Sequence, residues 1–79
     1  MEKKIQDVVI AAIADQLSKK KSEVQEASTL EELGADSLDR VEIVMKLEED
    51  LNVEIDDEEA DDLTSVGSWV KYLTTLTKQ

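Results

Sequence analysis

The sequence Leu-Gly-Ala-Asp-Ser-Leu-Asp at residues 33–39 marks the point where a loop ends and the longest amphipathic segment of the chain begins. Gly34 suits the left-handed residue that closes a turn, and Asp36 suits a helix N-cap whose carboxylate accepts from free N–H groups. Asp39 stands at the reciprocal capping-box position. The pattern therefore places the Ser37 hydroxyl in water at the first turn of a helix, where free N–H groups and the helix dipole favour an attached anion.

The helix that starts at Ser37 is predicted to run to about Leu51 and to carry two apolar stripes. The wider stripe is expected to face the core and consists of Ile43, Val44, Leu47 and Leu51. The second stripe lies near Ser37, is flanked by acidic residues and consists of Leu38, Val41 and Met45. An apolar patch with a charged rim is typical of an interaction site. The alternative is that the preceding loop covers this second stripe.

Three other helices are expected around this one. Apolar spacing predicts a helix over about residues 2–17 and another over about residues 66–76, the latter capped by Ser65 and with an inner face of Val66, Trp69, Val70, Leu73 and Leu76. Residues 52–55 are predicted to be an extended connector. A short helix should follow an Asp56 cap, with Glu59 at the reciprocal position, and end near Leu63. The sequence therefore predicts an all-α four-helix bundle with a short third helix, folded as one domain over residues 1–79.

Residues 18–36 show no sustained periodicity and predict a long loop between the first two helices. A loop of this length in so small a domain must be fixed to the core. The apolar residues expected to do so are Val24, Ala27, Leu30 and Leu33. Ser28 and Glu31 are expected to cap a short helical turn that Gly34 closes.

The acidic residues of the chain are concentrated around and after Ser37. Residues 31–62 hold fifteen acidic and two basic residues, whereas the whole 79-residue chain has a net charge of −11. Nucleic acid is excluded as a partner because its phosphates would be repelled and no basic stripe offsets this repulsion. The charge predicts partners with basic surfaces.

The composition excludes most kinds of active site. The chain has no Cys and no His, so it lacks a nucleophilic thiol, thiolate or imidazole metal ligands and the usual general base. With two glycines it can build no glycine-rich phosphate loop, and residues 56–62 fit no frame of an EF-hand. The apolar run at residues 8–13 is too short, and too close to Asp7 and Asp15, for a signal peptide or membrane span. We therefore expect a cytoplasmic, monomeric protein that is not an enzyme and binds no metal at a defined site.

Residues 30–72 resemble the acyl carrier protein family, in particular the free-standing carriers of fatty acid synthesis. The resemblance rests on residues 33–39, on Val41-Glu42, Val44-Met45 and Leu47-Glu48-Glu49, and on residues 55–60. It implies that Ser37, between Asp36 and Leu38, receives 4′-phosphopantetheine from a coenzyme A-dependent phosphopantetheinyl transferase. The thiol of that group would carry acyl chains as thioesters, and the chains would fold back between the helices into the apolar interior.

The same resemblance implies that the loaded carrier visits fatty acid synthesis enzymes and acyltransferases whose basic patches meet its acidic second helix. The residues expected to dock are Asp39, Val41, Glu42, Met45, Glu48 and Glu49. Two other interpretations stay open. The chain could carry polyketide or aminoacyl groups, or it could be an unmodified acidic bundle that binds proteins or buffers cations.

Three residues depart from the family pattern, and all of them concern the acyl cavity rather than the attachment motif. Asp56 stands where a proline is common, Leu30 or Leu51 where an aromatic is common, and Trp69 where a small residue is usual. Trp69 is expected either to fill part of the cavity or to lie across its rim with the indole N–H in water.

Overall fold

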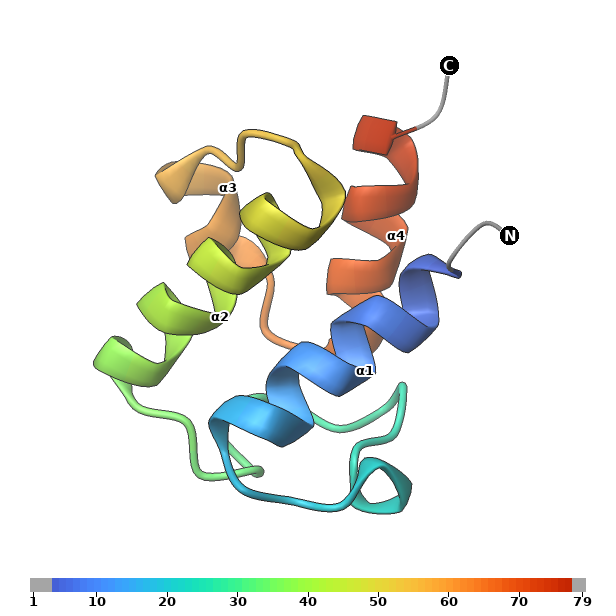
Figure 1. Cartoon of the computed structure of the whole chain (residues 1–79). Helices are drawn as coiled ribbons and strands as arrows, with labels where there is room; N and C mark the ends of the chain where they lie inside the picture. The colour runs from blue at the N-terminus through green and yellow to red at the C-terminus, as the bar shows by residue number, and fades with distance from the viewer. Residues whose placement is uncertain (1–3, 78–79) are drawn as a thin grey trace.

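The computed structural model describes residues 4–77, and in this range the chain is helical and contains no strand. Helix α1 (Ile5–Gln16) packs against both α2 (Ser37–Leu51) and α4 (Val66–Thr77) (Figure 1). The elements are α1 (Ile5–Gln16), the 3₁₀ helix η1 (Lys21–Glu23), α2 (Ser37–Leu51), α3 (Asp57–Asp62) and α4 (Val66–Thr77). The predicted all-α bundle with a short third helix and a long loop between α1 and α2 is therefore confirmed.

The core of the bundle is entirely apolar. No polar or charged residue among residues 4–77 is buried. The side chains that are at most 1% exposed come from α1, the loop, α2 and α4: Val9, Ile13, Leu30, Ile43, Leu47, Val66, Trp69 and Leu73. Helix α1 supplies this core as its spacing predicted, although it ends at Gln16 and Leu17 is its C-cap. The predicted start of α1 at residue 2 lies outside the described residues.

The long loop is fixed partly as predicted. Val24 and Leu30 are buried and Leu33 is half-buried, but Ala27 is exposed, so its assignment to the core was wrong. Ala27 lies in a turn whose neighbours bond through their backbones to the start of α4: the N–H of Val66 donates to the Ser28 carbonyl, and the N–H of Gly67 donates to the Glu26 carbonyl, both at 2.9 Å. Backbone hydrogen bonds, more than apolar side chains, therefore hold this part of the loop.

Gly67 allows the loop to approach α4 closely. A Cβ atom at Gly67 would lie 3.0 Å from Glu26 Cγ and 3.2 Å from the Glu26 carbonyl oxygen.

The helical turn after this contact is capped by Thr29 and Glu32, since the N–H of Glu32 donates to Thr29 Oγ1 and the N–H of Thr29 donates to Glu32 Oε1. The prediction of Ser28 and Glu31 as the capping pair was wrong by one residue, because the bridge between Thr29 and Ser65 sets the register.

Helix α4 begins at the predicted cap. The N–H of Ser68 donates to Ser65 Oγ, and the N–H of Ser65 donates to Ser68 Oγ. Trp69 is 1% exposed and packs edge-to-face on Tyr72, with the ring centroids 6.3 Å apart. Its indole N–H is buried without a hydrogen-bond partner among the described residues, so the alternative in which it reaches water was wrong. Leu76, predicted to face inward, is 40% exposed because α4 extends beyond the core at this end.

The acidic surface gives a first testable prediction. One ion pair occurs within residues 4–77, between Lys46 and Asp15, and it lowers the pKa of the Asp15 carboxyl through a hydrogen bond and charge attraction. The other acidic side chains therefore repel one another with little compensation, and salt screens such repulsion. We expect the melting temperature to rise by several degrees between low and moderate NaCl concentration. The variant Asp61→Asn/Asp62→Asn, with two fewer charges, should gain less, and a flat or falling melting curve for the parent would contradict the prediction.

Candidate functional site

The start of α2 is fixed by a reciprocal capping box. The N–H of Asp39 donates to Asp36 Oδ1 at 2.8 Å, and the N–H of Asp36 donates to Asp39 Oδ2 at 3.3 Å. The loop reaches this cap through Gly34, which has a φ of +90°, in the left-handed region that favours glycine. Both features agree with the prediction, and together they define where Ser37 begins the helix.

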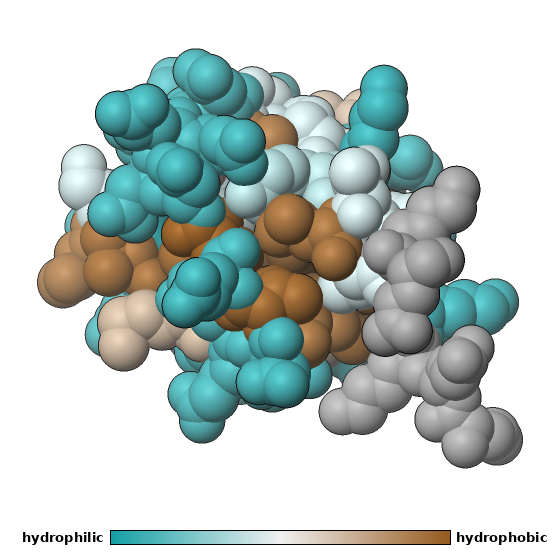
Figure 2. All heavy atoms as spheres, turned by 90° about the horizontal axis from the view of Figure 1, so that it is seen from above, coloured by the Kyte–Doolittle hydropathy of each residue, from teal (hydrophilic) through white to brown (hydrophobic). Residues whose placement is uncertain are grey.

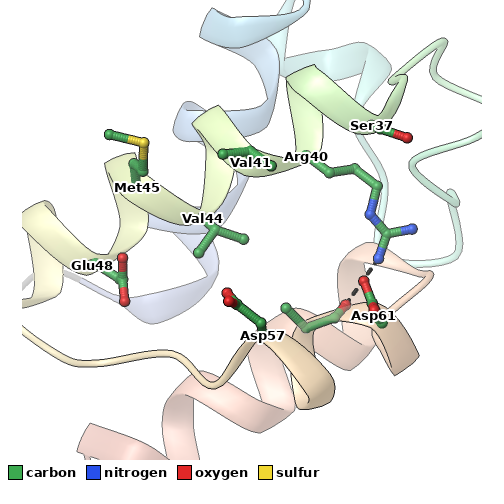
Figure 3. Close-up of a pocket in the computed structure, with 9 residues that line it drawn as sticks. Ser37, Arg40, Val41, Val44, Met45, Glu48, Asp57 and Asp61 are labelled. Atoms are coloured by element: carbon green, nitrogen blue, oxygen red, sulfur yellow. Dashed lines mark hydrogen bonds between the residues drawn. The ribbon is translucent and has the colours of Figure 1, made fainter.

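Ser37 is exposed at the first position of α2, and Leu38 beside it is 67% exposed. Figure 3 shows the Ser37 hydroxyl pointing away from the helix that follows. A hydroxyl in this position is accessible to a partner enzyme, and a phosphate on it would lie near the positive end of the helix dipole. The position therefore fits a covalently attached phosphodiester without displacing any core side chain.

A pocket of about 450 Å³ lies between α2 and α3 and extends from Ser37 along α2. This volume is within the range of about 300–1,000 Å³ that is usual for small-molecule sites. Its lining combines aliphatic and charged side chains: Ser37, Arg40, Val41, Val44, Met45, Glu48, Asp57, Ala60 and Asp61. The pocket is open to solvent, and its aliphatic surface begins within about one turn of the serine.

The two apolar stripes of α2 have the separate environments that were predicted. Ile43 and Leu47 are fully buried, whereas Leu38, Val41 and Met45 are 67%, 54% and 58% exposed. The loop does not cover this second stripe. In Figure 2 apolar surface reaches solvent on the side of the molecule where α2 lies, between groups of hydrophilic side chains.

The acidic residues predicted to dock partners differ in whether their carboxylates already accept hydrogen bonds from other parts of the protein. Gln16 of α1 donates to both Asp39 and Glu42, which ties these two carboxylates to the bundle. Glu48 is half-buried, and its Oε2 accepts from the backbone N–H of Ile55 at 2.9 Å, so it also holds the connector to α3. Glu49 is exposed. Glu48 therefore has a structural contact that the sequence did not indicate.

The connector and α3 form the far side of the pocket. Asn52 ends α2 in the left-handed conformation, and the chain then runs without regular structure to the Asp56 cap, as predicted. Asp56 Oδ1 accepts from the N–H of Glu58 at 2.8 Å, and the predicted reciprocal bond from Glu59 is not among the hydrogen bonds of the described residues. Glu59 instead lies beside Tyr72, where burial and this carboxylate raise the pKa of the phenol.

Arg40 is the functional candidate that the sequence reasoning missed. Its guanidinium lines the pocket and donates to the Ala60 carbonyl at 2.9 Å, which joins α2 to α3. A sequence signal for it existed, since Arg40 is the one basic residue between Lys21 and Lys46 and stands three residues after Ser37. That spacing places it on the same side of the helix as the serine.

No helix within residues 4–77 combines the length and the apolar character that a membrane crossing requires.

The model of the family described as "phosphopantetheine attachment site" matches residues 7–73, a span that includes α2, α3, the pocket and nearly all of the core. Members of this family carry covalently attached 4′-phosphopantetheine and interact with phosphopantetheinyl transferases and partner enzymes. With its helical bundle and this match, the chain belongs to the phosphopantetheine attachment site family and is a phosphopantetheine-carrying protein similar to acyl carrier proteins.

Proposed function

We propose that Ser37 is the attachment residue and that the chain carries fatty acyl intermediates as thioesters during fatty acid synthesis. The observation that supports this most is the exposed Ser37 hydroxyl at the capped start of α2, directly beside the pocket between α2 and α3. We also infer that Asp36 and Leu38 belong to the same motif, Asp36 by fixing the helix start and Leu38 by offering exposed apolar surface to the transferase.

The attachment step requires little of the carrier beyond presenting the hydroxyl. Ser37 Oγ forms a bond to the phosphorus of coenzyme A that bears the pantetheine, and the P–O bond to adenosine 3′,5′-bisphosphate breaks. The hydroxyl proton passes to a base of the transferase, because the chain contains no His. The thiol likewise comes from coenzyme A, because the chain contains no Cys. The carrier itself is therefore proposed not to be an enzyme.

The pocket favours a hydrocarbon cargo. Between its charged edges the lining consists of Val41, Val44, Met45 and Ala60. An aliphatic chain placed there would gain by removing apolar surface from water. The carbonyl groups of a polyketide would lose their hydration beside Val41, Val44 and Met45, whose side chains offer no hydrogen-bond donor, which is costly; the Arg40 guanidinium offers donors at the Ser37 end of the pocket. This difference supports fatty acyl groups over polyketide intermediates.

We further propose that the chain works as a single-domain monomer in the cytoplasm, where coenzyme A and the fatty acid enzymes are available to it. Its net charge of −11 supports the monomer, since copies of the chain repel one another. The proposed partners are a phosphopantetheinyl transferase and acyl-handling enzymes with basic docking patches. Their contact surface would be the exposed stripe of α2 together with its acidic rim.

The test of the proposed attachment is an intact-mass measurement. Protein produced without a phosphopantetheinyl transferase should gain the mass of one phosphopantetheine when it is incubated with a transferase and coenzyme A, and peptide mapping should place the added mass on Ser37. A transferase preparation that modifies a different carrier serves as the positive control. No mass gain under these conditions would favour the unmodified acidic bundle.

Charge reversal on α2 tests the docking surface. We expect Glu42→Lys/Glu49→Lys to slow association with a basic partner enzyme by about tenfold or more at low salt, because surface charges act mainly on the association rate. The matched control is Asp7→Lys/Glu23→Lys, which changes the net charge equally at exposed positions outside α2. Association and dissociation rates would be measured on the holo protein. Equal slowing by both double variants would show that net charge, and not the α2 surface, governs the encounter.

A further inference from the structure

Helix α3 depends on contacts outside itself. It has six residues, five of which are acidic, and Ala60 is its only buried side chain. A helix this short is unstable in isolation. Asp57 and Glu58 at its first turn interact favourably with the helix dipole, but Asp61 and Asp62 lie at its last turn, where negative charge is unfavourable. A cation at the C-terminal end of α3 would therefore have a large influence on its stability.

Arg40 supplies that cation from α2. Its Nη2 donates to the carbonyl of Ala60 at 2.9 Å and, more weakly, to the carbonyl of Leu63 at 3.4 Å. The Ala60 carbonyl lies in the last turn of α3, where it also accepts from the N–H of the C-cap residue Leu63 at 3.1 Å. Carbonyls at a helix C-terminus lack the regular N–H partners of the helix interior, so a donor from another helix helps to satisfy them. The side chain is half-buried, and hydrogen bonds from a charged donor are stronger than neutral ones. We call this pair of hydrogen bonds the interhelical cap.

The interhelical cap lies across the Ser37 end of the pocket. Figure 3 shows the Arg40 side chain crossing from α2 to α3 beside Ser37, with Val44 and Asp57 facing each other further along. Both Ser37 and Arg40 line the pocket. A chain that enters the pocket from the serine must therefore pass the guanidinium, and the separation of α3 from α2 at this point depends on the Arg40 hydrogen bonds.

We propose that Arg40 is a positioning residue that holds α3 against α2 and thereby limits the length of acyl chain that the pocket admits. This inference rests on the proposed function only for the identity of the cargo. Short chains fit beneath a closed interhelical cap, whereas longer chains require α3 to move outward and the cap to break. Arg40 thus contributes to chain-length preference without contacting the reacting thioester.

The first arm of the test needs no cargo. Arg40→Met keeps an apolar stem of similar reach but removes the donors and the charge, and Lys46→Met removes one charge from the same helix away from the pocket. Hydrogen exchange of the α3 amides should become about tenfold faster in Arg40→Met than in the parent, as expected for loss of a hydrogen bond to a charged group. Exchange in α1 and α4 should not change. Arg40→Lys should restore part of the protection, because an ammonium can still donate to the Ala60 carbonyl.

The second arm compares octanoyl and palmitoyl forms of the holo protein by the rate at which hydroxylamine cleaves the thioester. In Arg40→Met the palmitoyl form should gain protection relative to the octanoyl form, whereas Lys46→Met should match the parent. Unchanged α3 exchange, or an unchanged ratio of the two cleavage rates, would overturn the proposal. If Ser37 accepts no phosphopantetheine at all, the proposed function fails, and the exchange of the apo protein still decides whether Arg40 holds α3.

Discussion

Replacing Ser37 by alanine should abolish phosphopantetheine attachment and leave the helices intact. The side chain is exposed, and the cap of α2 comes from Asp36 and Asp39, so the hydroxyl supports no core contact. Surface substitutions of this kind usually change the free energy of unfolding by less than about 0.5 kcal/mol. Intact mass after treatment with a transferase and coenzyme A measures the first effect, and circular dichroism with urea unfolding measures the second.

The matched control is Ser22→Ala, which removes an exposed hydroxyl from η1. This variant should be modified as completely as the parent. A phosphopantetheine mass on Ser37→Ala would show that another hydroxyl is the attachment site. Loss of modification in both variants would point to a damaged transferase surface rather than to a missing nucleophile.

Replacing Trp69 by alanine should have the largest effect on stability. The indole is 1% exposed and lies among the fully buried side chains of the core. Substitutions of buried Trp or Phe by alanine cost about 3–5 kcal/mol because they remove apolar contacts and leave a cavity. A domain of this size has a total stability of only about 5–10 kcal/mol, so the variant should lose about a third of it or more. The free energy of unfolding in urea provides the measurement.

Two further substitutions separate the packing of Trp69 from its polar atom. Trp69→Phe removes the indole N–H, which is buried without a partner among residues 4–77, so it should destabilise far less than the alanine variant. Leu76→Ala on the same helix should cost less than about 1 kcal/mol, since Leu76 is 40% exposed. If Trp69→Ala were as stable as Leu76→Ala, the indole would not be part of the core in solution.

Helix α2 could be predicted closely because its signals are local. The cap at Asp36, the reciprocal Asp39 and the end near Leu51 are all readable within a few residues. The division of α2 into a buried and an exposed stripe also followed from periodicity alone, with Ile43 and Leu47 inside and Met45 outside. The position of Ser37 and its cap was predicted to the same degree, because both belong to this helix, whereas Arg40 was missed.

The features that the sequence did not predict all depend on contacts between distant segments. Ala27 is exposed because backbone bonds from the start of α4 determine the course of its loop. The hydrogen bonds of Arg40 to α3 and of Glu48 to the connector could not be read from periodicity, which describes one helix at a time. The exposure of Leu76 depends on how far the rest of the core extends along α4.

The pairing of the long loop with the start of α4 has a consequence for the order of folding events. The N–H of Leu30 donates to the Thr64 carbonyl, and the N–H groups of Val66 and Gly67 donate to the carbonyls of Ser28 and Glu26. These bonds join segments separated by more than thirty residues, so their formation must first overcome the closure entropy of the intervening chain. Helices α1 and α2 can nucleate from local signals before this closure. We therefore expect the loop that leads into Ser37 to reach its final path only after α4 has docked, as a late-folding segment although it lies in the first half of the chain.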